Sequence, residues 1–158
     1  MVIKKVNYIE EYLNGIIEIC NKISRDDIEK FIETIFEAWF EKRNIFIIGN
    51  GGSASTASHL TADLNNCLSD ISTHQIKAIC LSDNMARFSA LVNDSGWENV
   101  YTEQLKNYFQ PGDLVIAISV HGGSGKAKAG IWSQNLLAAL QYAKDRGGKA
   151  LGLAGFDG

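Results

Sequence analysis

The sequence predicts an α/β fold in which helices cover both faces of a parallel sheet. Four short apolar runs, at residues 45–48, 78–81, 114–118 and 150–154, do not alternate with polar residues. Such runs are typical of strands buried on both faces. Helical stretches over residues 53–66, 85–109 (with a break) and 126–146 separate the runs. This alternation of strand and helix predicts a parallel sheet.

A helical hairpin is predicted ahead of this sheet. Apolar residues recur every three or four positions from Ile9 to Ile23 and again from Ile28 to Phe40, which is the spacing of one helix face. Ser24, with Asp27 three residues on, reads as a helix N-cap between the two stretches. We expect one domain over residues 1–158, with the hairpin at 1–43 and the α/β core at 44–158.

Composition narrows the class of protein. The 158 residues are 46% hydrophobic and 21% charged, with a formal net charge of −3, as in a soluble globular protein. This charge argues against general binding to nucleic acid. Three separate cysteines indicate a reducing compartment. No signal peptide is visible and no stretch reaches the roughly 20 apolar residues that span a bilayer, so we expect a cytoplasmic protein without membrane partners.

Glycine-rich loops follow two of the predicted strands. After the first strand come Asn50, Gly51, Gly52 and Ser53, which open a helix. Glycine lets the backbone approach a ligand closely, and a helix N-terminus offers free N–H groups to an anion. The spacing is neither that of a dinucleotide fingerprint nor that of a Walker A loop. A plain turn with Ser53 as N-cap is the alternative.

The second loop contains Ser119, His121 and Ser124 and follows the third strand. Ligands of open parallel sheets bind beyond the carboxyl ends of the strands. Two such loops at one sheet edge favour a single phosphorylated ligand held between them.

Other candidates lie on helices and turns. His59 and Asp63 are four residues apart, so they share one helix face and are able to hold a divalent metal or act as acid and base. A plain surface pair explains the same spacing. Asp94 lies in an Asn-Asp-Ser-Gly segment that is typical of a turn, although a carboxylate there would also suit a sugar ring.

The motif Gly-Asn-Gly-Gly-Ser-Ala at residues 49–54, His59 at its spacing, the segment 92–94 and Ser119 before a Gly/Ser loop resemble the sugar isomerase (SIS) domain. The phosphoheptose isomerases are the most similar branch, and the resemblance covers essentially the whole chain. It implies a flavodoxin-like three-layer sandwich. It also implies an aldose–ketose isomerase that interconverts sedoheptulose 7-phosphate and D-glycero-D-manno-heptose 7-phosphate through an enediol, in heptose biosynthesis for lipopolysaccharide.

The same resemblance implies roles for single residues. Asn50, Gly51 and Gly52 match the sugar-side loop, and Asp94 matches an aspartate of the site. His59 matches a zinc ligand, and Asp63 stands where the isomerases carry a glutamate that is both metal ligand and catalytic acid/base. The family's phosphate-binding serines correspond to Ser53, Ser119 and Ser124. A homotetramer with sites between subunits is also implied.

Departures from the family pattern leave alternatives open. Asp63 is one methylene shorter than glutamate, and Val120 and His121 replace two hydroxyl residues. Residues 125–134 are additional, and Lys126 and Lys128 there offer charge to a phosphate. The family continues into a further strand and a helix with the remaining metal ligands, which we expect beyond residue 158. The alternatives are an isomerase of another phosphosugar and a non-catalytic SIS module that binds a sugar phosphate or a protein, like the DnaA initiator-associating protein.

Overall fold

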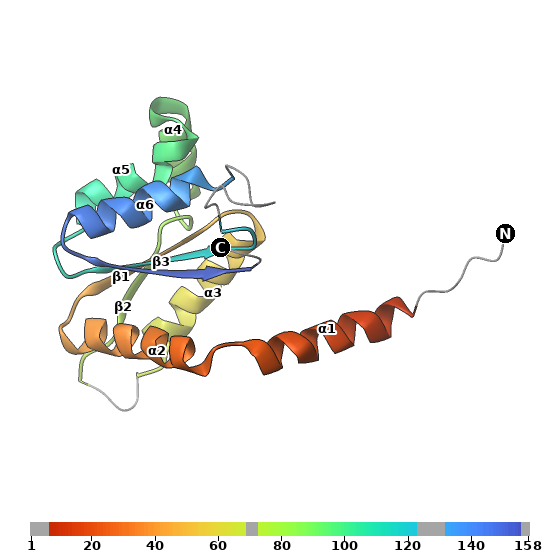
Figure 1. The fold of residues 1–158 in the computed structure, drawn as a ribbon. Coiled ribbons are helices and arrows are strands. Elements are labelled where there is room, and N and C mark those ends of the chain that lie inside the picture. The colour runs from red at the N-terminus through yellow and green to blue at the C-terminus, as the bar shows by residue number, and fades with distance from the viewer. Residues whose placement is uncertain (1–6, 69–72, 123–131, 156–158) are drawn as a thin grey trace. The chain divides into compact units, whose positions relative to one another are not determined.

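A computed structural model of the chain describes residues 7–68, 73–122 and 132–155. Its helices and strands follow the predicted order (Figure 1). In chain order they are α1 (Tyr8–Lys22), α2 (Arg25–Phe40), β1 (Asn44–Gly49), α3 (Gly52–Asn66), β2 (Lys77–Cys80), α4 (Met85–Ser95), the 3₁₀ turn η1 (Trp97–Asn99), α5 (Val100–Tyr108), β3 (Leu114–Ser119), α6 (Gln134–Asp145) and β4 (Lys149–Ala154).

The four strands form one parallel sheet in the order β2-β1-β3-β4. In the register between β1 and β3, Gly49 pairs with Ile118. The carboxyl ends of these two central strands therefore lie level at one sheet edge, and both predicted loops leave the sheet there. The predicted α/β fold with a parallel sheet is confirmed.

Helices cover both faces of the sheet (Figure 1). Helix α3 packs on β1 and β2, whereas α6 packs on β3 and β4 and also contacts α5. The core between α5, α6 and the sheet contains Phe46, Ile48 and Val115 from the strands, with Leu105 and Leu136 from the helices. Burial of such side chains stabilises the fold by about 1.5–3 kcal/mol each.

The edge strands differ from the prediction. β1 is buried along almost its whole length, but β2 alternates between exposed and buried residues, and the last three residues of β4 are exposed. The prediction that all four runs are buried on both faces is therefore wrong for β2 and β4. The physical reason is helix cover: α3 packs on β2 and α6 packs on β4, each on one face, whereas the central strand β3 contacts both helices.

The start of the last helix also differs. The predicted helix begins at residue 126, but α6 begins at Gln134, after a turn at Trp132 and Ser133. Ser133 has a φ of 62°, in the left-handed region, which interrupts a right-handed helix. Residues 126–131 lie outside the described part.

Contacts divide the chain into two compact units, Met1–Glu33 and Thr34–Gly158. The two predicted N-terminal helices are confirmed as α1 and α2, and the Asp27 N–H donates to Ser24 Oγ at 3.2 Å, as expected for an N-cap. Their pairing as a hairpin, and the union of hairpin and core in one domain, stay predictions.

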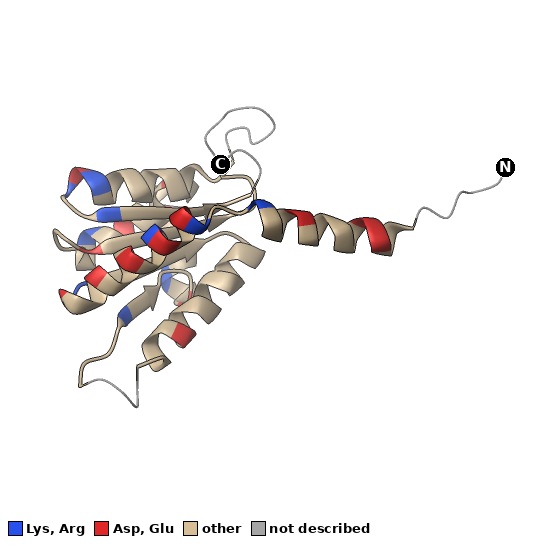
Figure 2. Cartoon of the chain, turned by 60° about the horizontal axis from the view of Figure 1, so that its bottom comes forward, with Lys and Arg blue, Asp and Glu red and all other residues tan. Residues whose placement is uncertain are grey.

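Charged residues are unevenly distributed over the helices. Figure 2 shows acidic and basic residues together on α2, whereas Asp63 is the one charged residue of α3. The loops that open from the sheet edge are therefore flanked by a helix that is nearly uncharged.

Among the described residues, no helix combines the length and apolar character needed to cross a membrane.

Candidate functional site

The loop between β1 and α3 is shaped by two glycines. A Cβ on Gly49 would lie 2.5 Å from the Ser53 carbonyl oxygen, so no other residue fits the close approach of strand end and helix start. Gly51 has a φ of 56°, which also favours glycine. The loop carbonyls of Asn50 and Gly51 accept from the N–H groups of Ser53 and Ala54, both at 3.0 Å. The N–H groups of Gly51 and Gly52 have no acceptor within the described residues, so they remain available to an anion.

Asn50 is held by a residue far away in the chain. Its Nδ2 donates to Asn135 Oδ1 at 3.0 Å, and Asn135 Nδ2 donates back to Asn50 Oδ1 at 2.9 Å. Asn135 Oδ1 also accepts from the Leu136 N–H at 3.0 Å. Asn135 is 0% exposed and lies in the first turn of α6. The two amides therefore tie the β1 loop to the start of α6.

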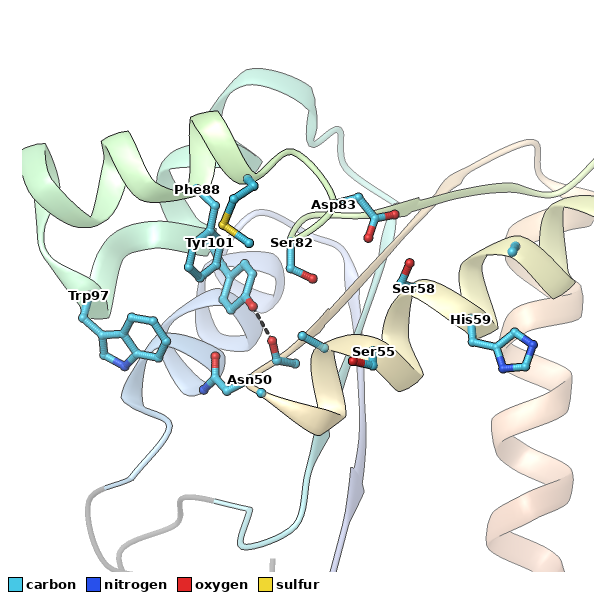
Figure 3. A pocket seen from close by; sticks show the side chains of 14 residues that line it. Asn50, Ser55, Ser58, His59, Ser82, Asp83, Phe88, Trp97 and Tyr101 are labelled. Atoms are coloured by element: carbon cyan, nitrogen blue, oxygen red, sulfur yellow. Dashed lines mark hydrogen bonds between the residues drawn. The ribbon is translucent and has the colours of Figure 1, made fainter.

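Tyr101 of α5 holds the same loop at its other end. Its hydroxyl donates to the Gly49 carbonyl oxygen (Figure 3). The ring is fully buried. Burial disfavours the phenolate and is the main reason that the pKa of Tyr101 is raised from 10.0 to about 12. Tyr101 therefore stays a neutral donor at physiological pH.

The end of β3 supplies the second loop. Ser119 Oγ accepts from the Gly122 N–H at 3.1 Å, which folds residues 119–122 into a tight turn. The Ser119 hydroxyl is able to donate its proton to another group while its oxygen accepts this bond. A hydroxyl donor is thus presented at the strand end beside the β1 loop.

Both loops line one cavity of about 690 Å³, which we name the β3 pocket. This volume lies within the range of about 300–1,000 Å³ that is usual for small-molecule sites. No Lys, Arg, Asp or Glu is among the described residues that line it: Asn50, Ser53, Trp97, Ile118, Ser119, Val120, His121, Trp132 and Ser133. The polar groups of this described lining are amides, hydroxyls, an imidazole and indole N–H groups.

A second cavity of about 730 Å³ lies between α3, α4 and the end of β2; we name it the β2 pocket. Asn50 and Trp97 line both pockets, so the two cavities adjoin at these side chains. In Figure 3, Ser58 of α3 faces Asp83 across this cavity. On the other side lie the aromatic rings of Phe88, Trp97 and Tyr101.

His59 and Asp63 lie on the outer side of α3. His59 Nε2 is 3.8 Å from Asp63 Oδ1, and the two side chains are 81% and 70% exposed. His59 reaches the rim of the β2 pocket with its ring directed away from the aromatic side chains (Figure 3), and Asp63 is not part of that lining.

This pair fits part of a zinc site. Imidazole nitrogen and carboxylate oxygen are ligands that zinc prefers, and two donors bound at about 2.0–2.1 Å lie at most about 4 Å apart. The separation of 3.8 Å meets that limit. Within the described residues, no group of three or more His, Cys, Asp or Glu side chains is placed to hold a metal. The described residues therefore supply two donors at this position.

The remaining predicted residues are more scattered. Asp94 lies near the end of α4, where its Oδ1 accepts from Asn93 Nδ2 at 2.8 Å, and it belongs to the lining of neither pocket. It is helical rather than in a turn, because α4 continues to Ser95. Ser124, Lys126 and Lys128 lie outside the described residues.

Sequence reasoning missed several lining residues. Ser82 and Asp83 follow β2, and the rule that points to polar residues at strand ends applies to them as well. Ser55 and Ser58 are one helical turn apart on α3, a spacing that places both on one face. No local signal points to Asn135, because its partner Asn50 is 85 residues away.

Comparison with known proteins defines the class of protein. The family model described as "SIS domain" matches residues 8–155. The chain belongs to the SIS domain family. This agrees with the resemblance carried by the glycine motif, which forms the loop after β1, and by Ser119, which forms the turn after β3.

Within this family, the chain is similar to proteins named phosphoheptose isomerase. It is 37% identical to that of Nitratiruptor sp. over 77% of this chain and 60% of the relative. It is 34% identical to that of Helicobacter pylori over 94% of this chain and 70% of the relative. It is also 40% identical to the lincomycin biosynthesis protein LmbN of Streptomyces lincolnensis, over 80% of this chain and 45% of the relative. The chain thus spans about half of that relative and about three fifths of the Nitratiruptor protein.

Solved structures agree on the fold. The structure of a phosphoheptose isomerase from Francisella tularensis superposes with a TM-score of 0.79 at 24% identity, over 96% of this chain and 72% of that one. The phosphoheptose isomerase GmhA from Neisseria gonorrhoeae gives the same score and identity, over 96% and 73%. At this identity the likeness establishes the fold.

Proposed function

We propose that the protein is an aldose–ketose isomerase that acts on sedoheptulose 7-phosphate or a related phosphorylated sugar. The observation that carries the proposal is the β3 pocket, where the β1 loop and the Ser119 turn meet at level strand ends. The relatives named phosphoheptose isomerase support the reaction class.

The phosphate belongs in the β3 pocket. Its described lining holds no carboxylate, whereas Asp83 lines the β2 pocket and would repel an anion there. The hydroxyls of Ser53 and Ser119, which line this pocket, and the N-terminal end of α3 are the expected donors. Ser124, Lys126 and Lys128, outside the described residues, are proposed to complete this set. His121 takes the place of a family hydroxyl residue at the rim.

Asn50, Gly51 and Gly52 are proposed to face the sugar beyond its phosphate. Asp94 stays a proposed site residue, although it lies on α4 outside the described linings of both pockets. Asn50 lines both pockets, so it lies where a chain of carbons would leave the phosphate. A phosphate held at one end orients the reacting end of the sugar and removes part of the entropic barrier to reaction.

Isomerisation requires two proton movements. A base takes the proton from the carbon next to the carbonyl and returns it to the former carbonyl carbon, while a second group moves a proton between the two oxygens. His59 and Asp63 are the proposed acid/base pair of this chain, since imidazole and carboxylate side chains are groups that take up and release protons in acid/base catalysis. Their exposure leaves both groups accessible.

The same two residues are the proposed zinc ligands contributed by α3. When bound, zinc supplies positive charge near the negative charge that develops on the enediolate. The spacing of Nε2 and Oδ1 supports this assignment.

We further propose a cytoplasmic homotetramer with sites built between subunits. Helix α1 supports an assembly, because Ile9, Tyr12, Leu13 and Ile16 are exposed on it. Exposed apolar side chains in a contiguous stripe are typical of protein contacts. Sedimentation velocity of the purified protein tests the subunit count.

A substrate panel tests the proposed reaction. The purified natural protein, supplied with zinc, is incubated with sedoheptulose 7-phosphate, other ketose phosphates and unphosphorylated sedoheptulose. We expect product from at least one phosphorylated ketose and none from the free sugar. The Helicobacter pylori phosphoheptose isomerase serves as an active control. Ligand-induced stabilisation without turnover would instead favour a binding module.

A further inference from the structure

We infer that Asn135 is a positioning residue for the ligand site: its buried amide sets the orientation in which Asn50 meets the ligand. The inference rests on the proposed function only in that a phosphorylated polyol occupies the pockets. Asn135 itself is fully buried and, within the described residues, belongs to the lining of neither pocket.

The hydrogen bonds of Asn135 leave it little freedom. Its Oδ1 accepts two hydrogen bonds, from Asn50 Nδ2 and from the Leu136 N–H, and its Nδ2 donates to Asn50 Oδ1. The bond to Leu136 fixes which end of the Asn135 side chain is the oxygen, since a backbone N–H requires an acceptor. The orientation of the Asn135 amide is therefore set by its own helix, independently of Asn50.

This orientation is passed on to Asn50. An amide that pairs with another amide at both its oxygen and its nitrogen has one alignment that satisfies both. The oxygen of Asn50 is thereby held at 2.9 Å from Asn135 Nδ2, and its nitrogen at 3.0 Å from Asn135 Oδ1. The Asn50 amide keeps a second N–H on its nitrogen and a second lone pair on its oxygen. These are the groups that Asn50 offers to a ligand in the two pockets that it lines.

The loop around Asn50 contains a flexible residue, so side-chain contacts are needed to restrain its conformation. The next residue, Gly51, has a left-handed φ and lacks a side chain that would restrict it. Tyr101 holds Gly49 on one side, and Asn135 holds Asn50 on the other. Pre-organising a binding group lowers the entropy lost when the ligand binds.

A double-mutant cycle tests the inference. The wild-type protein, Asn50→Ala, Asn135→Ala and the double variant are titrated with a hexitol 6-phosphate, which cannot isomerise, and with inorganic phosphate. We expect Asn135→Ala to weaken hexitol phosphate binding about tenfold, in line with the loss of a hydrogen-bonded orientation. In the Asn50→Ala background the same substitution is expected to have no further effect. Equal weakening in both backgrounds would overturn the inference.

Asn65→Ala is the matched control. Asn65 also uses both ends of its amide, donating to the Ala78 carbonyl at 3.0 Å and accepting from the Ala78 N–H at 2.9 Å, but it lines neither pocket. We expect it to lower the unfolding temperature while leaving the hexitol phosphate affinity unchanged. If it weakens binding as much as Asn135→Ala does, both act through stability and the inference is wrong.

An NMR measurement without ligand separates this inference from the proposed function. The side-chain NH₂ of Asn50 should exchange slowly with solvent in the wild type and fast in Asn135→Ala. Slow exchange in both proteins would show that Asn135 does not hold the Asn50 amide and would contradict the inference. If no phosphosugar is turned over, while the Asn50 NH₂ exchanges slowly in the wild type and hexitol phosphate binds, the isomerase proposal alone is wrong.

Discussion

The Tyr101 hydroxyl donates a hydrogen bond to the carbonyl oxygen of Gly49, which joins α5 to the last residue of β1. Gly49 is the point where the chain leaves the sheet for the glycine loop, and both groups are buried. The loop therefore starts from a carbonyl that is fixed in direction. Asn135 fixes the next residue, so the two side chains act in sequence along the loop.

Removing this hydroxyl should destabilise the protein. Tyr101→Phe leaves the Gly49 carbonyl buried without that donor, which lowers the free energy of unfolding by about 1–3 kcal/mol. Urea denaturation measures the difference. Tyr108→Phe is the control, because the Tyr108 hydroxyl accepts from Arg87 at the surface and its loss is expected to change stability by less than about 0.5 kcal/mol. Equal effects of the two substitutions would contradict a special role for Tyr101.

The contribution of the Tyr101 hydroxyl to the free energy of unfolding should decrease at alkaline pH. The pKa of Tyr101 is raised from 10.0 to about 12 by folding, so between these values the folded state keeps a proton that the unfolded state has lost. Stability from this group is therefore full below pH 10.0 and falls as the pH rises toward about 12, by roughly 2–3 kcal/mol in total. The advantage of the wild type over Tyr101→Phe should shrink over this interval in denaturation curves. A constant difference up to pH 12 would refute the assignment.

A single methyl group should distort the glycine loop. Gly49→Ala places a Cβ 2.5 Å from the Ser53 carbonyl oxygen, and the backbone must shift to admit it. We expect a loss of about 1–3 kcal/mol in the free energy of unfolding, as for other overpacked sites. Gly52→Ala is the matched control, since nothing lies within 4 Å of a Cβ there and its φ is ordinary. It should be neutral or stabilising by up to about 1 kcal/mol, because alanine favours a helix.

Loss of the Ser119 hydroxyl should weaken anion binding. Ser119→Ala removes a donor to the phosphate and the acceptor that closes the turn onto the Gly122 N–H. We expect the dissociation constant for inorganic phosphate, measured by calorimetry, to rise about tenfold. Val120→Ala changes the neighbouring exposed side chain in the same pocket and should leave phosphate affinity nearly unchanged. Unaltered binding by Ser119→Ala would remove the β3 pocket as the phosphate site.

Substitution of the proposed zinc ligands should lower zinc affinity while leaving the free energy of unfolding nearly unchanged. His59→Ala and Asp63→Ala remove exposed side chains, so each should change the free energy of unfolding by less than about 0.5 kcal/mol. Zinc affinity, measured by competition with a chelating dye, should fall about tenfold or more in both. Thr56→Ala, one helical turn before the pair, is the control. Zinc binding that survives both substitutions would place the metal elsewhere.

Local patterns predicted the elements well. The stripe of apolar residues along α1 and the unbroken apolar run of β1 are local signals, and both elements occur where these signals lie. Burial of whole strands was predicted less well. β1 and β4 carry similar apolar runs, but β1 is a central strand and β4 is an edge strand. A run of six residues does not determine the place of its strand in the sheet.

The candidate site divides in the same way. Residues that follow a strand directly, such as Asn50 and Ser119, were found by their place in the chain and line one pocket. Asp94 is a predicted site residue in a segment whose local Asn-Asp-Ser-Gly signal is typical of a turn. It lies in α4, outside both described linings, because the helix pattern of residues 85–95 prevails over that local signal. Ser58 and Asp83 come from separate elements, and only packing of α3 beside the end of β2 brings them to one cavity.

By itself, the sequence determined the order of helices and strands, the positions of the two loops and the glycines that they require, because periodicity and backbone freedom are properties of neighbouring residues. The tertiary structure decided that the loops share a pocket, that Tyr101 holds Gly49 and that Asn135 holds Asn50. The physical reason is that these contacts join residues 52 and 85 positions apart, and they form only when the strand order and the packing of α5 and α6 bring the partners together.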